Sequence, residues 1–145
     1  MKSCICKITG TGAEINVSIG FHAGFIVAYN EDGNVVAHWS YLHGAGKGQK
    51  TYDEGTTETG IAEVTTAGFS EYAGGKIVDS TGALTGTTHV VVDENGTALT
   101  NGRRSSAGFT IGTDADINAN GEVLEIHVIE RGAIATTSSV YTDEG

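Results

Sequence analysis

Short segments in which apolar and polar residues alternate recur along the chain. Residues 13–20 carry the pattern clearly, because Ile15, Val17 and Ile19 fall on one side of an extended strand and polar side chains fall on the other. No segment has the sustained 3.6-residue apolar repeat of a helix that packs on a core. The pattern therefore predicts strands. The further strand candidates are Ser3–Thr9, Ile61–Thr66, Lys76–Asp79, Gly108–Gly112, Val123–Glu130 and Ile134–Tyr141.

Two other pairs of strand-like segments are separated by short turns that are typical of β-hairpins. An Asp-Gly pair lies between Phe25–Tyr29 and Val35–Trp39, and an Asn-Gly pair lies between Thr88–Val92 and Thr97–Thr100. Glycine is favoured in such turns because they need a positive φ. The sequence therefore predicts two hairpins with turn glycines at positions 33 and 96.

The segment Leu42–Thr59 is small, polar and rich in glycine, and it predicts a long loop because it has almost nothing to bury. At 145 residues the chain has a common size for one domain. Short strands at these intervals are typical of sandwiches and barrels. We therefore expect one all-β domain over residues 1–145, an antiparallel β-sandwich or barrel with long Gly-rich loops. Residues 1–9 and 133–145 are candidate extended arms.

The composition favours strands and turns, and the charge limits the partners. The chain has 22 Gly and no Pro, and its formal net charge is −10. This charge repels phosphate backbones, so nucleic-acid binding is disfavoured. No stretch of about 18 apolar residues is present that would span a bilayer, so we expect a soluble chain without a membrane partner. Residues 1–7 lack a long apolar run, and we expect no secretory signal there.

The glycine-rich segment Gly44–Thr51 has part of the pattern of a phosphate-binding loop. That motif needs a second glycine directly before its Lys-Ser/Thr pair, and Gln49 stands at that place. The sequence indicates neither an apolar parallel strand before the segment nor a helix after it, so no helix dipole would hold the anion. We therefore predict no nucleotide site.

An acidic and amide-rich segment, Asp114–Glu122, places oxygen-bearing side chains at alternate positions. Counted from Asp116, the spacing matches the first half of a calcium-binding loop. The position that should hold a bidentate Glu is His127, and strand-like sequence follows where a helix should. A tight polar turn between two strands accounts for the same residues, and we favour it over a calcium site.

The remaining candidate residues predict no reactive centre. Cys4 and Cys6 would project from one side of a strand, too far apart for an undistorted disulfide and without further ligands at zinc spacing, so core-type thiols are expected. The sequons at Asn16 and Asn95 are interpreted as chance matches. Because no known catalytic motif is present, we predict no catalytic, cofactor-binding or metal residues. The histidines, interpreted as ordinary surface or edge residues, are His22, His38, His43, His89 and His127.

Six segments together carry a resemblance to a known group of proteins. They are Val17–Phe21, Gly24–Asn34, His38–Ser40, Thr51–Ile61, Glu71–Gly75 and Ala107–Glu122. The first three resemble the opening of small phage virion proteins that are encoded near capsid genes, the next two are placed as in those proteins, and the last, with the strand after it, is similar to their closing module. The resemblance covers roughly residues 15–130. Such proteins are described only as structural, so it implies no functional residues.

The resemblance implies a non-enzymatic structural protein of a phage particle, made in the host cytoplasm and incorporated into the virion. We expect a capsid decoration or cement protein that binds the major capsid protein, and that forms a homotrimer because capsid lattices present local three-fold sites. The alternative is a receptor- or glycan-binding module of a head or tail fibre, in which Trp39, Tyr41 and Tyr52 would stack on sugar rings. An enzyme is the least favoured class, because scattered carboxylates cannot be paired without a fold.

Overall fold

The computed structural model describes residues 1–53, 59–74, 88–92, 96, 98–100 and 107–132. These residues form ten strands and no helix, so they include no helix that would span a membrane. The strands are β1 (Ser3–Thr9), β2 (Ile15–Ser18), β3 (Ala23–Asn30), β4 (Val35–Ser40), β5 (Lys47–Asp53), β6 (Thr59–Tyr72), β7 (Thr88–Val92), β8 (Ala98–Thr100), β9 (Gly108–Ile111) and β10 (Val123–Glu130). The all-β prediction is confirmed. The strand candidates Lys76–Asp79 and Ile134–Tyr141 lie outside the described residues.

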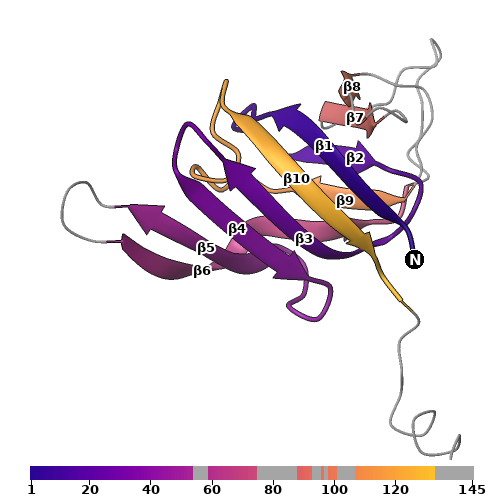
Figure 1. Cartoon of the computed structure of the whole chain (residues 1–145), viewed down its shortest axis with the longest axis horizontal. Coiled ribbons are helices and arrows are strands. Elements are labelled where there is room, and N and C mark those ends of the chain that lie inside the picture. Colours follow the sequence, from indigo (N-terminus) through magenta and orange to yellow (C-terminus); the bar gives the residue numbers. More distant parts are fainter. Residues whose placement is uncertain (54–58, 75–87, 93–95, 97, 101–106, 133–145) are drawn as a thin grey trace, which may run out of the picture.

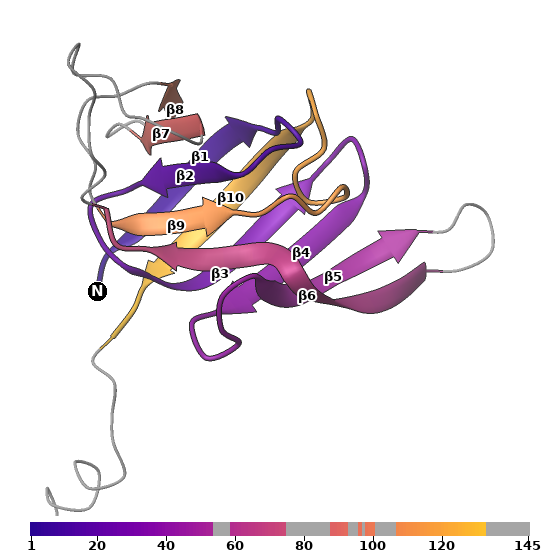
Figure 2. The ribbon, with the colours of Figure 1, turned by 180° about the vertical axis from the view of Figure 1, so that it is seen from behind.

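The strands form one sheet that curls into a nearly closed barrel (Figure 1, Figure 2). Their order is β1-β10-β3-β4-β5-β6-β9-β2-β7-β8. All neighbours pair antiparallel except β2 and β7, so the predicted antiparallel sheet is in fact mixed. Gly96, which lies between β7 and β8, approaches the carbonyl oxygen of Ile5 on β1 so closely that a Cβ on the glycine would collide with it. The two ends of the sheet therefore nearly meet.

The N-terminal strand belongs to the body of the barrel. β1 pairs with β10 along its whole length, and its inward residues Cys6 and Ile8 are both 2% exposed. Removal of residues 1–9 would therefore take away core side chains as well as one end of the sheet. The other candidate arm, residues 133–145, lies outside the described residues.

Both predicted hairpins are present, as β3–β4 and as β7–β8. Gly96 has the expected positive φ of 78°. In the first hairpin, however, Asn34 rather than Gly33 takes the positive φ, with a value of 52°. Asn tolerates this conformation better than most residues do. The N–H of Gly33 is instead bonded to the side-chain oxygen of Asn30, at 3.1 Å, which fixes the start of the turn.

The prediction of a long loop over Leu42–Thr59 is wrong, because residues 47–53 form β5 between β4 and β6. Backbone hydrogen bonds hold this strand, so it does not need the apolar alternation on which the prediction relied. A register shift between Lys47 and Gly48 marks a bulge at its start. β6 is also longer than the predicted Ile61–Thr66, since it pairs first with β5 and then with β9 (Figure 2).

The second strand is buried on both sides, which the alternation did not predict. Ile15 and Val17 are fully buried, as expected, but Asn16 is only 5% exposed although it points the other way. The Thr110 hydroxyl donates a hydrogen bond of 2.7 Å to the Asn16 side-chain oxygen, which satisfies both groups away from water. A cross-strand polar pair therefore replaces the expected solvent contact.

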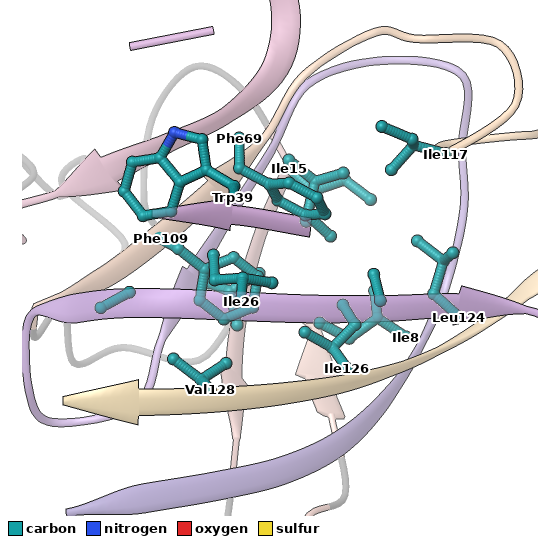
Figure 3. Packing of buried hydrophobic residues seen from close by; sticks show 14 of the residues in the cluster. Ile8, Ile15, Ile26, Trp39, Phe69, Phe109, Ile117, Leu124, Ile126 and Val128 are labelled. Atoms are coloured by element: carbon teal, nitrogen blue, oxygen red, sulfur yellow. The ribbon is translucent and has the colours of Figure 1, made fainter. Parts of the chain in front are cut away.

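Large apolar side chains fill the barrel, as Figure 3 shows for part of the cluster. The rings of Phe69 and Phe109 meet edge to face, with centroids 6.4 Å apart. Trp39 is 1% exposed, and its indole N–H donates to the carbonyl oxygen of Gly44 at 2.9 Å. Small barrels are commonly filled in this way. The surface rather than the interior is therefore the place to search for function.

Candidate functional site

The acidic segment is tied to β5 through an ion-pair cluster. Lys50 Nζ lies 2.8 Å from Asp114 Oδ2 and 2.6 Å from Asp116 Oδ2. Asp114 Oδ1 also accepts the backbone N–H groups of Asp116 and Ile117, at 3.0 and 3.1 Å. Both carboxylates therefore neutralise a lysine that points toward the inside of the barrel.

Asn118 holds the same segment against the turn before β2. Its side-chain N–H groups donate to the carbonyl oxygens of Ala13 and Gly112, at 2.7 and 2.8 Å. Its side-chain oxygen accepts the N–H groups of Thr11 and Gly12, at 2.9 and 3.3 Å. All four bonds that one amide group can make are thus formed by a side chain that is fully buried.

Together these contacts describe a structural turn. Ile117, which is 2% exposed, points from the turn into the core (Figure 3). The oxygens that a calcium loop would supply from Asp116 and Asn118 are directed to Lys50 and to backbone groups. These hydrogen bonds account for the tight polar turn that the sequence predicts between the strands now seen as β9 and β10.

Replacement of Lys50 by methionine is expected to lower the free energy of unfolding by roughly 2 kcal/mol at neutral pH, because it leaves two carboxylates without their cation. Burial acts to lower the pKa of Lys50, but hydrogen bonds and charges from Asp114 and Asp116 outweigh it and raise the pKa. A raised folded-state pKa means that the stabilisation is complete below the ordinary value of 10.5 and is lost as the pH rises above it.

Urea unfolding of the two proteins at increasing pH measures this difference. The difference in free energy of unfolding between wild type and Lys50→Met should be constant near neutrality and should decrease above a pH of about 10.5. Lys47→Met, at an exposed position on the same strand, is the matched control and should have little effect. The ion-pair account would be contradicted if Lys50→Met had the same free energy of unfolding as wild type, or if the difference between them increased at alkaline pH.

The segment Gly44–Thr51 forms the β4–β5 turn and most of β5. The N–H of Gly46 is bonded to the carbonyl oxygen of Phe69 and to the hydroxyl of Ser70, at 2.9 and 2.8 Å. Lys50, which would face a phosphate, holds the two aspartates instead. The segment therefore forms part of the barrel wall.

Of the three aromatic residues proposed for sugar stacking, two have described side chains, and neither presents an open ring. Trp39 is buried in the core. Tyr41 is half-buried beneath Arg131, whose guanidinium carbon lies 4.9 Å from the ring centroid. The side chain of Tyr52 lies outside the described residues. Nη1 of Arg131 also donates to the two carboxylate oxygens of Glu71 on β6, at 2.7 and 2.9 Å. Arg131 therefore links the Tyr41 ring to β6.

Four of the five histidines have described side chains. His22 is exposed before β3, and His127 is on β10. His38 and His43 are close, with ring centroids 6.4 Å apart. Nδ1 of His43 accepts the backbone N–H of Ser40 at 3.0 Å, so this ring closes the turn after β4. The side chain of His89 lies outside the described residues.

The two cysteines are free thiols with different surroundings. Cys6 is 2% exposed and belongs to the core, as predicted. Cys4 is half-buried and packs only at the margin of the core, so the prediction of a core-type thiol holds for it only in part.

The outward side of β1, β10, β3 and β4 is apolar over much of its area, and we call it the outer face. Strand alternation turns one set of side chains into the barrel and the other set to solvent. The large apolar side chains on this face, with their exposed fractions, are Ile5 (59%), Phe25 (40%), Tyr29 (37%), Val36 (36%), Val123 (40%) and Ile129 (43%). An exposed apolar patch on this scale is typical of an interaction site.

The strand register makes the outer face continuous. Ile129 on β10 lies directly opposite Phe25 on β3. His127 lies between its two cross-strand partners, Ile5 on β1 and Val27 on β3. Neighbouring outward side chains on paired strands are close enough to contact a partner together.

The outer face has no net formal charge, although the chain has a net charge of −10. At the outward positions of its four strands, which are all described, Lys7 contributes +1 and Glu125 contributes −1. These two residues are opposite each other in the register of β1 and β10. His127 Nε2 also lies 3.5 Å from Glu125 Oε2. Another surface therefore meets no net charge from the outward residues of these four strands.

Sequence reasoning missed the outer face, although a signal was present. Residues 25–29 read Phe-Ile-Val-Ala-Tyr, so both sides of this strand are apolar. A strand that faces a core on one side and water on the other should alternate. The run therefore indicated that the outward side of this strand is apolar as well.

The outer face offers contact area and hydrogen-bonding groups rather than a reacting centre. Among the described residues, no three His, Cys, Asp or Glu side chains gather as a metal ion would require. The outer face is therefore suited to binding another surface. No protein-family model, curated protein or solved structure matches this chain.

Proposed function

We propose that the chain is a non-enzymatic structural protein of a phage particle, a decoration protein that binds the assembled capsid through its outer face. The observation that carries the proposal is an outer face that is rich in exposed apolar side chains and has no net formal charge, on a chain that is acidic and whose barrel interior is filled. The resemblance of residues 15–130 to small virion proteins supplies the context. The partner is the major capsid protein, and the chain is made in the host cytoplasm before it enters the virion.

The physical properties fit a protein that accumulates before it assembles. A net charge of −10 keeps free copies apart and in solution. Burial of the outer face then stabilises the bound state by about 25 cal/mol for each Å² of apolar surface removed from water. A homotrimer is part of the proposal, because three linked copies on a local three-fold site turn modest contacts into high avidity.

The fibre alternative has less support. It relied on Trp39, Tyr41 and Tyr52 as a stacking platform, and the burial of Trp39 removes the largest of the three rings. Phe25 and Tyr29 on the outer face are exposed aromatic residues. Each has one aliphatic cross-strand partner, which is Ile129 for Phe25 and Val36 for Tyr29. Aliphatic neighbours of this kind favour an apolar protein surface over a hydrated glycan.

Co-sedimentation with capsids tests the proposal. Purified chain is mixed with assembled shells of the phage that encodes it, and the pelleted fraction is measured in the presence of excess double-stranded DNA. We expect saturable binding at a fixed number of copies per shell, unchanged by the DNA. Failure to pellet at concentrations of about tens of micromolar would refute the decoration role.

A further inference from the structure

Two histidines lie in one cross-strand row of the outer face. The row runs from Ile5 on β1 through His127 on β10 and Val27 on β3 to His38 on β4. Strand alternation turns all four side chains outward. Adjacent strands are about 4.8 Å apart, so the backbones at the two histidines are about 10 Å apart. A partner that covers the outer face therefore covers both imidazoles together.

Three titratable groups surround His127 on the outer face. Glu125 Oε2 lies 3.5 Å from His127 Nε2. Lys7 on β1 and Tyr29 on β3 are the cross-strand partners of that glutamate. Lys7 already balances the charge of Glu125, and the outward positions of these three strands hold no further carboxylate. A proton on His127 therefore adds a positive charge that the outer face does not offset.

His38 has a second imidazole beside it, since its ring centroid is 6.4 Å from that of His43. On β5 its cross-strand partner is Gln49, which is uncharged. The lysines of that strand are the exposed Lys47 and Lys50, which belongs to the ion-pair cluster. The outward positions of β3 and β4 hold no carboxylate. A proton on His38 is therefore not offset on the outer face either.

We propose that this row makes docking sensitive to pH, so that the outer face binds a neutral, apolar part of the capsid protein at neutral pH and releases it in acid. The inference rests on the proposed function, because it concerns the same face. An imidazole gains its proton between about pH 8 and pH 5. Lys7 and Glu125 cancel, so protonation of both histidines takes the outward positions of the face from no net charge to +2.

The aliphatic residues of the row define the chemistry of the partner. Ile5 and Val27 lie on the two sides of His127, and Val27 also separates it from His38. A surface that packs on these aliphatic side chains removes water from the imidazoles between them. An imidazolium loses far more hydration energy than a neutral imidazole does, and two of them repel each other more strongly once water is removed. Acid therefore weakens the docked state.

Co-sedimentation with capsid shells at pH 8 and at pH 5.5 tests the proposal. The wild type is compared with a double variant that carries His38→Gln and His127→Gln. Affinities are compared within each protein, so an effect of the substitutions on binding at pH 8 does not enter. We expect the wild type to bind about tenfold or more weakly at pH 5.5, and the double variant to change by less than about threefold. Each single variant should lie between them.

His22→Gln is the matched control, because His22 is exposed before β3 and lies outside the row. It should keep the pH dependence of the wild type. Thermal melting at both pH values checks that each free protein is folded, and the single variants decide the question if the double variant is not. Binding of the double variant at pH 5.5 also shows that the shells are intact there.

Three results would overturn the pH dependence and leave the decoration role standing. They are wild-type binding that is equal at the two pH values, wild-type binding that strengthens in acid, and a double variant that weakens as much as the wild type. Strengthening in acid would mean that carboxylates of the partner face the row. Absence of binding at pH 8 would instead refute the decoration role, and this inference with it.

Discussion

Replacement of Asn118 by aspartate is expected to lower the free energy of unfolding by about 3 kcal/mol or more at neutral pH. The aspartate would keep the shape and could still accept from Thr11 and Gly12. It would have no N–H to donate to the carbonyl oxygens of Ala13 and Gly112, and a buried carboxylate would then face two acceptors. Urea denaturation monitored by the fluorescence of the single tryptophan measures the loss.

Asn120→Asp is the matched control, because Asn120 is exposed in the same turn. We expect it to change the free energy of unfolding by less than about 0.5 kcal/mol. If the Asn118 and Asn120 variants unfold at the same urea concentration as wild type, Asn118 does not hold the turn against the barrel. A large loss for both would instead point to a general sensitivity of this turn to added negative charge.

Replacement of Phe25 by glutamate should weaken binding to capsid shells by about 100-fold or more, which corresponds to about 2.7 kcal/mol. Phe25 is an outer-face residue opposite Ile129, and its side chain is 40% exposed in the free chain. The added carboxylate would lose its hydration on docking without gaining a partner. Binding isotherms from sedimentation with purified shells give the change in affinity.

Leu42→Glu controls for the added charge and the lost apolar group. Leu42 is 80% exposed, and it lies in the turn after β4, outside the four strands of the outer face. This variant should bind shells within about threefold of wild type, and both variants should keep the wild-type melting temperature. Equal losses for both variants, or none for Phe25→Glu, would show that docking does not use the outer face.

Local turn chemistry explains which parts of the fold could be predicted from the sequence. Asp-Gly and Asn-Gly turns specify hairpins within a few residues, and both hairpins formed where expected. β5 could not be predicted in the same way. It is held by its neighbours in the sheet and by Lys50, whose partner Asp114 is 64 residues further along the chain. No pattern within a short window records such a contact.

The candidate site was less predictable than the fold. Apolar residues on both sides of Phe25–Tyr29 show that the strand is not half-solvated, but they do not show which side is the core. That choice depends on how β3 pairs with β10 and β4, and β10 is about a hundred residues away in the sequence. The burial of Asn16 and Thr110 could not be predicted for the same reason, since their hydrogen bond joins two strands that are far apart in the sequence.

Electron microscopy of the intact particle, at a resolution that places side chains, tests the central claim most directly. The account predicts many copies of the chain at symmetry-related positions on the capsid, with Phe25 and Ile129 of the outer face against the major capsid protein. Absence of the chain from the particle would contradict the account. So would a few copies at a fibre tip, or capsid-bound copies whose outer face is turned to solvent.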